Sequence, residues 1–137
     1  MPLLTVTRLV RFNAAHRVHN PALSDEENLR LFGKCNNPNG HGHNYTLEIS
    51  VTGEPDAGSG YVIDLADVKR IAEREFVNHV DHKNLNLDVP FMRGTNPTTE
   101  NIVVAAWRQL EPALRPRRLT RLRLWETENN YVEYDGH

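Results

Sequence analysis

Two long stretches of the chain alternate apolar and polar residues, and this two-residue period predicts β-strands. The first covers residues 3–13, where one face is formed by Leu4, Val6, Val10 and Phe12. The second covers residues 41–51, where one face is formed by Tyr45, Leu47, Ile49 and Val51. Because each strand has one apolar and one polar face, we expect a sheet that is covered on one side.

Two later stretches carry apolar residues at intervals of three and four, which is typical of amphipathic helices. A helix is predicted over residues 65–80, with Asp64 at the capping position. Its stripe consists of Leu65, Val68, Ile71, Ala72, Phe76 and Val80. A second helix is predicted over residues 98–114, with Pro97 in its first turn. Its stripe consists of Ile102, Val103, Ala106, Trp107 and Leu110.

A shorter helix is expected in the polar segment between the two strands. Ser24 and Glu27 have the spacing of a capping box, and Gly33 stands where such a helix would end. Because this segment contains few apolar residues, we expect it to lie at the surface.

The remaining segments complete one α+β domain over residues 1–137. A short strand is predicted over residues 61–63 and a long loop over 81–97. Two further strands, over residues 122–126 and 131–134, are joined by a turn. The order of the main elements predicts a four-stranded antiparallel sheet with two helices packed on one face.

The charge and hydrophobicity of the chain argue against nucleic-acid-binding, membrane-spanning and secreted proteins. The chain has 16 Lys and Arg against 18 Asp and Glu, so its net charge is -2, which argues against a nucleic-acid partner. No apolar run approaches the roughly 18 residues of a membrane span, and the first residues lack the pattern of a signal peptide. We therefore expect a cytoplasmic protein without a membrane partner.

The chain contains a single cysteine, Cys35, and seven histidines.

His41 and His43 are two residues apart on a predicted strand, so both imidazoles point to the same face. Two neutral imidazoles on one face could form part of a zinc site. Either His16 or His19, near the end of the first strand, could supply a third ligand. Three histidines with an open fourth position are typical of catalytic zinc, whereas an isolated His-x-His pair is more often only polar surface.

Cys35 lies six residues before His41, in a segment of Asn, Pro and Gly that predicts a turn. A lone cysteine is most often a small buried apolar residue. Beside a divalent cation its thiolate would be favoured, so Cys35 could act as a base or nucleophile. The alternative is that Cys35 is a fourth zinc ligand, which would close the site and exclude catalysis.

Two carboxylates are further candidates for chemistry. Asp81 precedes His82 where the first long helix ends, and a carboxylate beside an imidazole can fix its tautomer for proton transfer. Such a pair is also common at solvated helix ends. Glu126 shares the apolar face of its strand with Leu122 and Leu124, so it either forms a structural ion pair or awaits a ligand with hydrogen-bond donors.

A local basic cluster near the C-terminus is formed by Arg115, Arg117, Arg118, Arg121 and Arg123. Such a cluster could bind phosphates or nucleic acid. It lacks the interleaved aromatic residues that stack on bases, so a solvated strand face or a subunit contact is the favoured interpretation.

Five short motifs, in order along nearly the whole chain, resemble those of the 6-pyruvoyl-tetrahydropterin synthases. They are residues 12–17 (FNAAHR), 35–45 (CNNPNGHGHNY), 80–86 (VDHKNLN), 97–101 (PTTEN) and 125–127 (WET). Residues 23–35 and the five-residue spacer between Cys35 and His41 look like the biopterin branch of this family. The related 6-carboxy-tetrahydropterin synthases of queuosine biosynthesis typically have a three-residue spacer.

The resemblance implies a tunnelling-fold (T-fold) subunit, in which three sheets close into a trimer barrel and two trimers form a homohexamer. It implies one Zn²⁺ per subunit, held by His16, His41 and His43, and it leaves His19 without a role. It also implies that Cys35 is the general base, that Asp81 and His82 form a proton relay, and that Glu126 anchors the pterin. The start of the second long helix is implied to contact substrate through Thr98, Thr99 and Glu100.

The implied reaction converts 7,8-dihydroneopterin triphosphate into 6-pyruvoyl-tetrahydropterin with elimination of triphosphate. It is an internal redox rearrangement, so no nicotinamide is expected, and the chain has no glycine-rich dinucleotide motif. Mg²⁺ is a candidate companion of the triphosphate, which Lys34, Arg17 or the arginine cluster could bind. The alternatives are 6-carboxy-tetrahydropterin synthesis and a non-catalytic zinc- or pterin-binding module.

Overall fold

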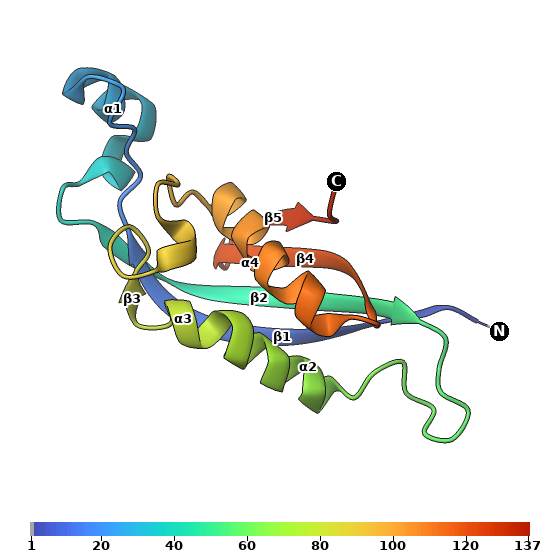
Figure 1. Cartoon of the computed structure of the whole chain (residues 1–137). Coiled ribbons are helices and arrows are strands. Elements are labelled where there is room, and N and C mark those ends of the chain that lie inside the picture. Colours follow the sequence, from blue (N-terminus) through green and yellow to red (C-terminus); the bar gives the residue numbers. More distant parts are fainter. Residues whose placement is uncertain (1) are drawn as a thin grey trace.

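The computed structural model describes residues 2–137, in which helices cover one face of a five-stranded sheet (Figure 1). The strand order across the sheet is β3-β1-β2-β4-β5. The strands are β1 (Leu4–His16), β2 (His41–Gly53), β3 (Lys83–Asn84), β4 (Arg118–Thr127) and β5 (Asn130–Tyr134). The helical elements are α1 (Asp25–Phe32), η1 (Gly33–Asn36), α2 (Leu65–Ala72), η2 (Glu73–Val77), α3 (Asn78–Val80), η3 (Pro90–Met92) and α4 (Thr99–Leu114).

The two longest strands, β1 and β2, pair antiparallel along their whole length. Their register places Phe12 opposite Tyr45, and these two rings stack with centroids 4.8 Å apart. The apolar face of β2 and the second half of the apolar face of β1 are buried under the helices, where Phe76 of η2 contacts Phe12 edge to face. Leu4, at the start of β1, is exposed instead. The predicted α+β layering, with helices on one face of the sheet, is therefore confirmed.

The helix caps follow the sequence signals. Asp64 accepts a hydrogen bond from the N–H of Ala66 at the start of α2, and Ser24 accepts one from Glu27 at the start of α1. Thr98 caps α4 through the N–H of Asn101, so the helix begins at Thr99 and the prediction of Pro97 inside its first turn is wrong by two positions. The second long helix is otherwise where the apolar stripe predicts it.

The predicted number of strands was wrong. Residues 81–97, predicted to be a loop, include the two-residue strand β3, which pairs parallel to β1 at the edge of the sheet. The sheet is thus mixed and five-stranded rather than four-stranded and antiparallel. Two residues carry too little hydrophobic pattern to predict a strand, and β3 forms because the chain returns past the end of β1 after α3.

Residues 61–63 were predicted as a strand but pair with no strand among residues 2–137. Val62 and Ile63 are nevertheless buried, so their apolar character reflects packing against the core rather than a sheet ladder. The predicted helix over residues 65–80 is helical throughout but contains the wider π-type turn η2 in its middle. Phe76 and Val77 are buried in that wider turn.

At one end of the sheet, β1 runs three residues further than predicted, to His16, and β2 begins at His41. In Figure 1 the chain leaves this end toward α1, which projects away from the layer of sheet and helices. The end of the sheet where His16 and His41 lie is therefore framed by loops from several parts of the chain. Within residues 2–137, no helix combines the length and the apolar character that crossing a membrane requires.

Candidate functional site

Three histidines converge at this end of the sheet. The register pairs His16 of β1 with His41 of β2, and the alternation of β2 puts His43 on the same face as His41. One nitrogen from each ring lies within 4.8 Å of the other two, and Nε2 of His16 lies 3.1 Å from Nε2 of His41. Two nitrogens bound to one tetrahedral zinc ion are about 3.3 Å apart, so this spacing fits a shared cation.

The bonds around the rings also suit metal ligands. Nδ1 of His16 lies 2.7 Å from the carbonyl oxygen of Pro97, which requires a proton on Nδ1 and leaves Nε2 with a free lone pair. Nε2 of His43 is buried without a hydrogen-bond partner among the described residues. Burial is the main cause that lowers the pKa of His16 and of His43, so both are held in the neutral form that binds a metal.

Cys35 is brought close to the site by η1, the short 3-10 helix that follows α1. Its carbonyl accepts a hydrogen bond of 2.8 Å from the N–H of Val18, which ties the turn to the chain just beyond β1. Among residues 2–137, the donor group able to hold a metal ion consists of the three histidines and does not include Cys35. Its thiol instead lines a cavity of about 380 Å³.

The cavity beside Cys35 gathers most of the other predicted site residues. It is also lined by Thr98, Thr99, Glu100 and Glu126. Oε2 of Glu126 accepts a hydrogen bond of 2.7 Å from the hydroxyl of Thr99, which fixes the carboxylate at the start of α4. The strand end of β4 and the first turn of α4 therefore build one wall together.

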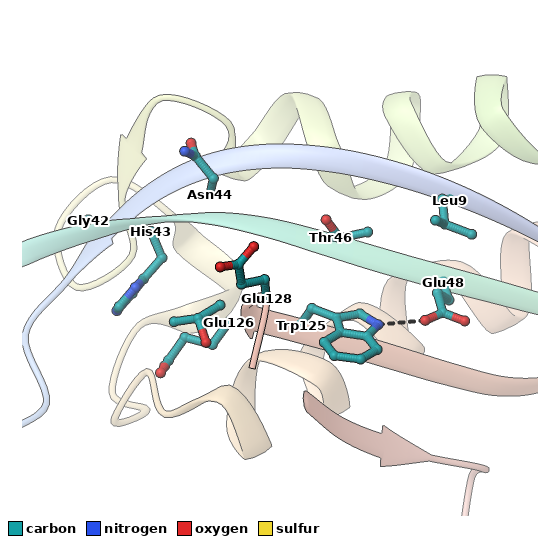
Figure 2. Close-up of a pocket in the computed structure, with 10 residues that line it drawn as sticks. Leu9, Gly42, His43, Asn44, Thr46, Glu48, Trp125, Glu126 and Glu128 are labelled. Atoms are coloured by element: carbon teal, nitrogen blue, oxygen red, sulfur yellow. Dashed lines mark hydrogen bonds between the residues drawn. The ribbon is translucent and has the colours of Figure 1, made fainter. Parts of the chain in front are cut away.

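Glu126 also lines a second cavity, of about 620 Å³, with His43 (Figure 2). The pairing of β4 with β5 shifts register between Trp125 and Thr127, just where Glu126 lies. Its negative charge acts on the rings of His16 and His43 and partly offsets the lowering of their pKa by burial. The carboxylate thus lies near His16 and His43 and forms no ion pair with Lys or Arg of the described chain.

Asp81 and His82 form the predicted pair, with Oδ1 of Asp81 3.0 Å from Nδ1 of His82. Oδ1 of Asp81 also accepts the N–H of Asn13, and this bond is the main cause that lowers the pKa of Asp81. His82 has a positive φ of 60° and a side chain that is 82% exposed. Neither residue lines the cavity of Cys35 within one chain.

The other histidines lie outside the metal group. Nδ1 of His19 is 2.7 Å from Oδ1 of Asn36, and Nε2 of His79 is 3.0 Å from the carbonyl of Arg74. Sequence reasoning missed Tyr45, whose buried hydroxyl has no hydrogen-bond partner among the described residues and whose ring centroid is 5.6 Å from that of His43. The two-residue spacing from His43 would have placed it on the same face.

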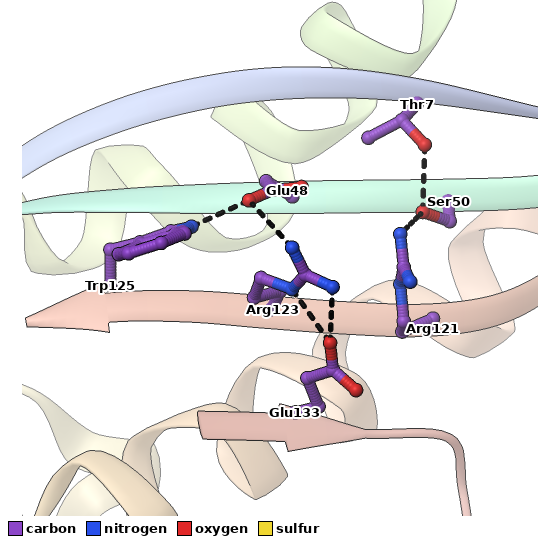
Figure 3. Close-up of polar contacts among 7 residues, drawn as sticks. All are labelled: Thr7, Glu48, Ser50, Arg121, Arg123, Trp125 and Glu133. Carbon is purple, nitrogen blue, oxygen red and sulfur yellow. Dashed lines mark hydrogen bonds and ion pairs between the residues drawn. The ribbon is translucent and has the colours of Figure 1, made fainter. Parts of the chain in front are cut away.

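The arginine cluster does not form one basic surface. Arg115 pairs with Glu111, and Arg123 lies between Glu133 and Glu48 on the sheet face away from the helices (Figure 3). On the same face, Arg121 lies 3.5 Å from the hydroxyl of Ser50. These contacts make Arg121 and Arg123 parts of a polar strand face.

Comparison with known proteins gives one consistent family. A model of the family described as 6-pyruvoyl tetrahydropterin synthase matches residues 5–137. The 6-pyruvoyl tetrahydrobiopterin synthase of Homo sapiens is 48% identical over 131 residues, which cover 96% of this chain and 90% of that protein. A 6-carboxy-5,6,7,8-tetrahydropterin synthase of Rickettsia typhi is 28% identical over 149 residues, covering 96% and 99%.

A solved structure gives the same result. The Caenorhabditis elegans 6-pyruvoyl tetrahydropterin synthase superimposes with a TM-score of 0.93 at 41% sequence identity. The match covers 100% of this chain and 98% of that one.

Proposed function

Because the chain belongs to the 6-pyruvoyl tetrahydropterin synthase family, we propose that it converts 7,8-dihydroneopterin triphosphate into 6-pyruvoyl-tetrahydropterin and triphosphate. Membership of this family means that the chain is a T-fold subunit and an enzyme of the lyase type. One observation carries the proposal: three histidines with converging nitrogens lie next to a carboxylate that shares a cavity with a free thiol.

We propose zinc as the metal, held by His16, His41 and His43, one ion per subunit. Three neutral imidazoles suit Zn²⁺, and a three-ligand site keeps a position open for substrate. When bound, zinc polarises the side-chain oxygens of the substrate and makes the adjacent C–H bonds more acidic. Mg²⁺ would accompany the triphosphate, since Mg²⁺ prefers phosphate oxygens.

Cys35 is proposed as the general base that removes protons from the substrate side chain. Its thiol lines the cavity that Glu126 also lines, so a substrate anchored by the carboxylate can present its side chain to the sulfur. The absence of Cys35 from the group of convergent donors supports a base rather than a fourth ligand.

Glu126 is proposed to anchor the pterin. With Oε2 occupied by the Thr99 hydroxyl, Oε1 is free to accept from the N–H groups of the amino-pyrimidinone edge. Thr98 and Glu100 line the same cavity and are proposed to contact substrate there. A carboxylate that is partly buried without an ion-pair partner gains most from such donors.

Asp81 and His82 are proposed to return protons as a relay. Asp81 holds the Nδ1 proton of His82, which leaves Nε2 to exchange protons with a substrate. Because His82 is largely exposed and lies away from the cavity of Cys35, the relay is proposed to act on the site of a neighbouring subunit. This arrangement belongs to a homohexamer of two trimer barrels, and we propose a cytoplasmic location for it.

The product identifies the reaction. We would incubate the zinc-loaded protein with 7,8-dihydroneopterin triphosphate, without nicotinamide, and determine the mass of the pterin product. The proposal predicts a pyruvoyl-pterin and no acetaldehyde. A carboxylated pterin with acetaldehyde would show 6-carboxy-tetrahydropterin synthesis instead, and bound zinc without turnover would indicate a binding module.

A further inference from the structure

A cavity of about 880 Å³ lies beside the three histidines and has no role in the reaction as described above. Its walls continue directly from the metal centre, because Arg17 follows His16 and Gly40 precedes His41 along the chain. A Cβ atom at Gly40 would lie 3.1 Å from the carbonyl oxygen of His16, so the two walls touch.

The cavity is lined by a cation and by no carboxylate. Arg17 and His19 are the two side chains of basic type in its lining, and neither Asp nor Glu contributes. Nε of Arg17 donates to the carbonyl of Asn36 at 3.0 Å, and its guanidinium forms no ion pair with the described residues. Acidic residues outnumber basic ones in the whole chain, which has a net charge of -2. The lack of acidic side chains in this cavity is therefore a local feature and does not follow from the composition.

Three asparagines present hydrogen-bond donors to the same cavity. Each has its side-chain oxygen occupied by a backbone N–H, which can only donate, so the identity of the oxygen is fixed. The bonds run from Ala22 to Asn20 at 3.0 Å, from Asn86 to Asn84 at 2.9 Å, and from His19 to Asn96 at 3.0 Å. Their Nδ2 groups have no hydrogen-bond partner among residues 2–137, so each can donate to a bound ligand.

We propose that this cavity, called the Arg17 cavity below, binds the triphosphate of the substrate. A guanidinium and several amide donors without a carboxylate favour a polyanion with many acceptor oxygens and disfavour a metal cation. Its contact with the strand ends that carry the metal centre places the leaving group next to the proposed reaction site. This inference rests on the proposed function, and it selects Arg17 over Lys34 and the arginine cluster.

Binding of inorganic tripolyphosphate tests the site without turnover. We would titrate it by calorimetry into zinc-loaded wild-type protein in buffer that contains Mg²⁺, and compare Arg17→Gln and Asn96→Asp. Asn96→Asp keeps the oxygen that accepts from His19 and replaces the free amide by a negative oxygen. Each variant should weaken binding by about 10- to 100-fold, as expected when a hydrogen bond to a charged group is lost.

The controls separate charge and folding from the local contacts. Asn78→Asp, an exposed position outside the cavity, makes the same change in net charge and should bind tripolyphosphate as wild type does. Zinc content and circular dichroism of each variant report folding. If Arg17→Gln disturbs the fold, Arg17→Lys keeps the charge and should retain partial binding.

The outcomes distinguish this inference from the proposed function. The inference predicts that tripolyphosphate inhibits competitively with substrate and that both variants raise KM. Unchanged tripolyphosphate affinity in both folded variants overturns it, even if wild type makes the pyruvoyl product. Weakened tripolyphosphate binding with unchanged KM also overturns the assignment to the substrate. Arg17-dependent binding in a protein without turnover would keep the anion site and reject the proposed function.

Discussion

Replacing Glu126 by Gln tests whether its carboxylate anchors the substrate. The substitution keeps the side-chain shape and an oxygen for the Thr99 hydroxyl, which now donates to Oε2 at 2.7 Å. It removes the negative charge and turns one acceptor into a donor. The pterin edge would then face an N–H group instead of a carboxylate oxygen.

The expected magnitude follows from the loss of one charge-assisted hydrogen bond. Such a bond contributes about 1.5–3 kcal/mol, which corresponds to a fall in kcat/KM of about 10- to 150-fold. Because the anchor holds the pterin ring in both ground and transition states, most of the loss should appear in KM. The free energy of unfolding should change little, since Glu126 has no ion-pair partner to lose in the described chain.

Steady-state kinetics with 7,8-dihydroneopterin triphosphate measures this effect. Glu128→Gln is the matched control, because Glu128 is an exposed carboxylate that lines the same cavity as Glu126 and His43 (Figure 2). Zinc content must be measured as well, since Glu126 influences the charge of His16 and His43. Wild-type kcat/KM in Glu126→Gln, at full zinc occupancy, would refute the anchoring role.

Three further predictions follow from single contacts. His43→Ala should abolish the rise in Tm on zinc addition, and a zinc-dependent rise of wild-type size in a melting assay would contradict the site. Tyr45→Phe should leave the free energy of unfolding of the metal-free protein equal to or higher than that of wild type, because the Tyr45 hydroxyl has no hydrogen-bond partner in the described structure. A loss above about 1 kcal/mol in urea unfolding would show that the hydroxyl has a partner. Asp81 has a lowered pKa, so its contribution to stability is present above the ordinary value of 3.8 and is lost as pH falls through the lower folded value. The difference in urea stability between wild type and Asp81→Asn should therefore shrink below pH 3.8, and a difference independent of pH would exclude this linkage.

The sequence predicted the elements whose side chains repeat over many residues. Alternation over residues 41–51 identified β2, and the stripe over residues 98–114 identified α4, because burial on one face imposes a period on a long element. The two-residue β3 carries no such period, and it is formed by the return of the chain. Val62 and Ile63 show the opposite error, since short apolar runs also occur where a loop packs on the core.

The candidate site was only partly accessible to sequence reasoning. The spacing of His41 and His43 predicted a shared face, and the structure confirms it. The choice between His16 and His19 depended on where β1 ends, which the alternation placed three residues too early. The family resemblance favoured His16 over His19. The structure supplies the physical reason, because His16 lies directly opposite His41 in the pairing of β1 with β2.

The sequence offered Arg17 as one of several candidates for the triphosphate, but it did not predict the Arg17 cavity. Its asparagines come from loops and from the two-residue strand β3, which are far apart in the chain, and none belongs to a periodic pattern. In Asn20, Asn84 and Asn96 a backbone N–H occupies the side-chain oxygen and the amide nitrogen stays free, which only the folded structure reveals.

The zinc content of Cys35→Ala, measured together with its turnover, tests most directly whether three histidines hold the metal while Cys35 acts as the base. We predict one zinc ion per subunit, as in wild type, with turnover reduced by about 100- to 10,000-fold, the range for loss of a general base. Loss of zinc together with the thiol would contradict the open three-histidine site, and wild-type turnover with zinc retained would contradict the catalytic role of Cys35.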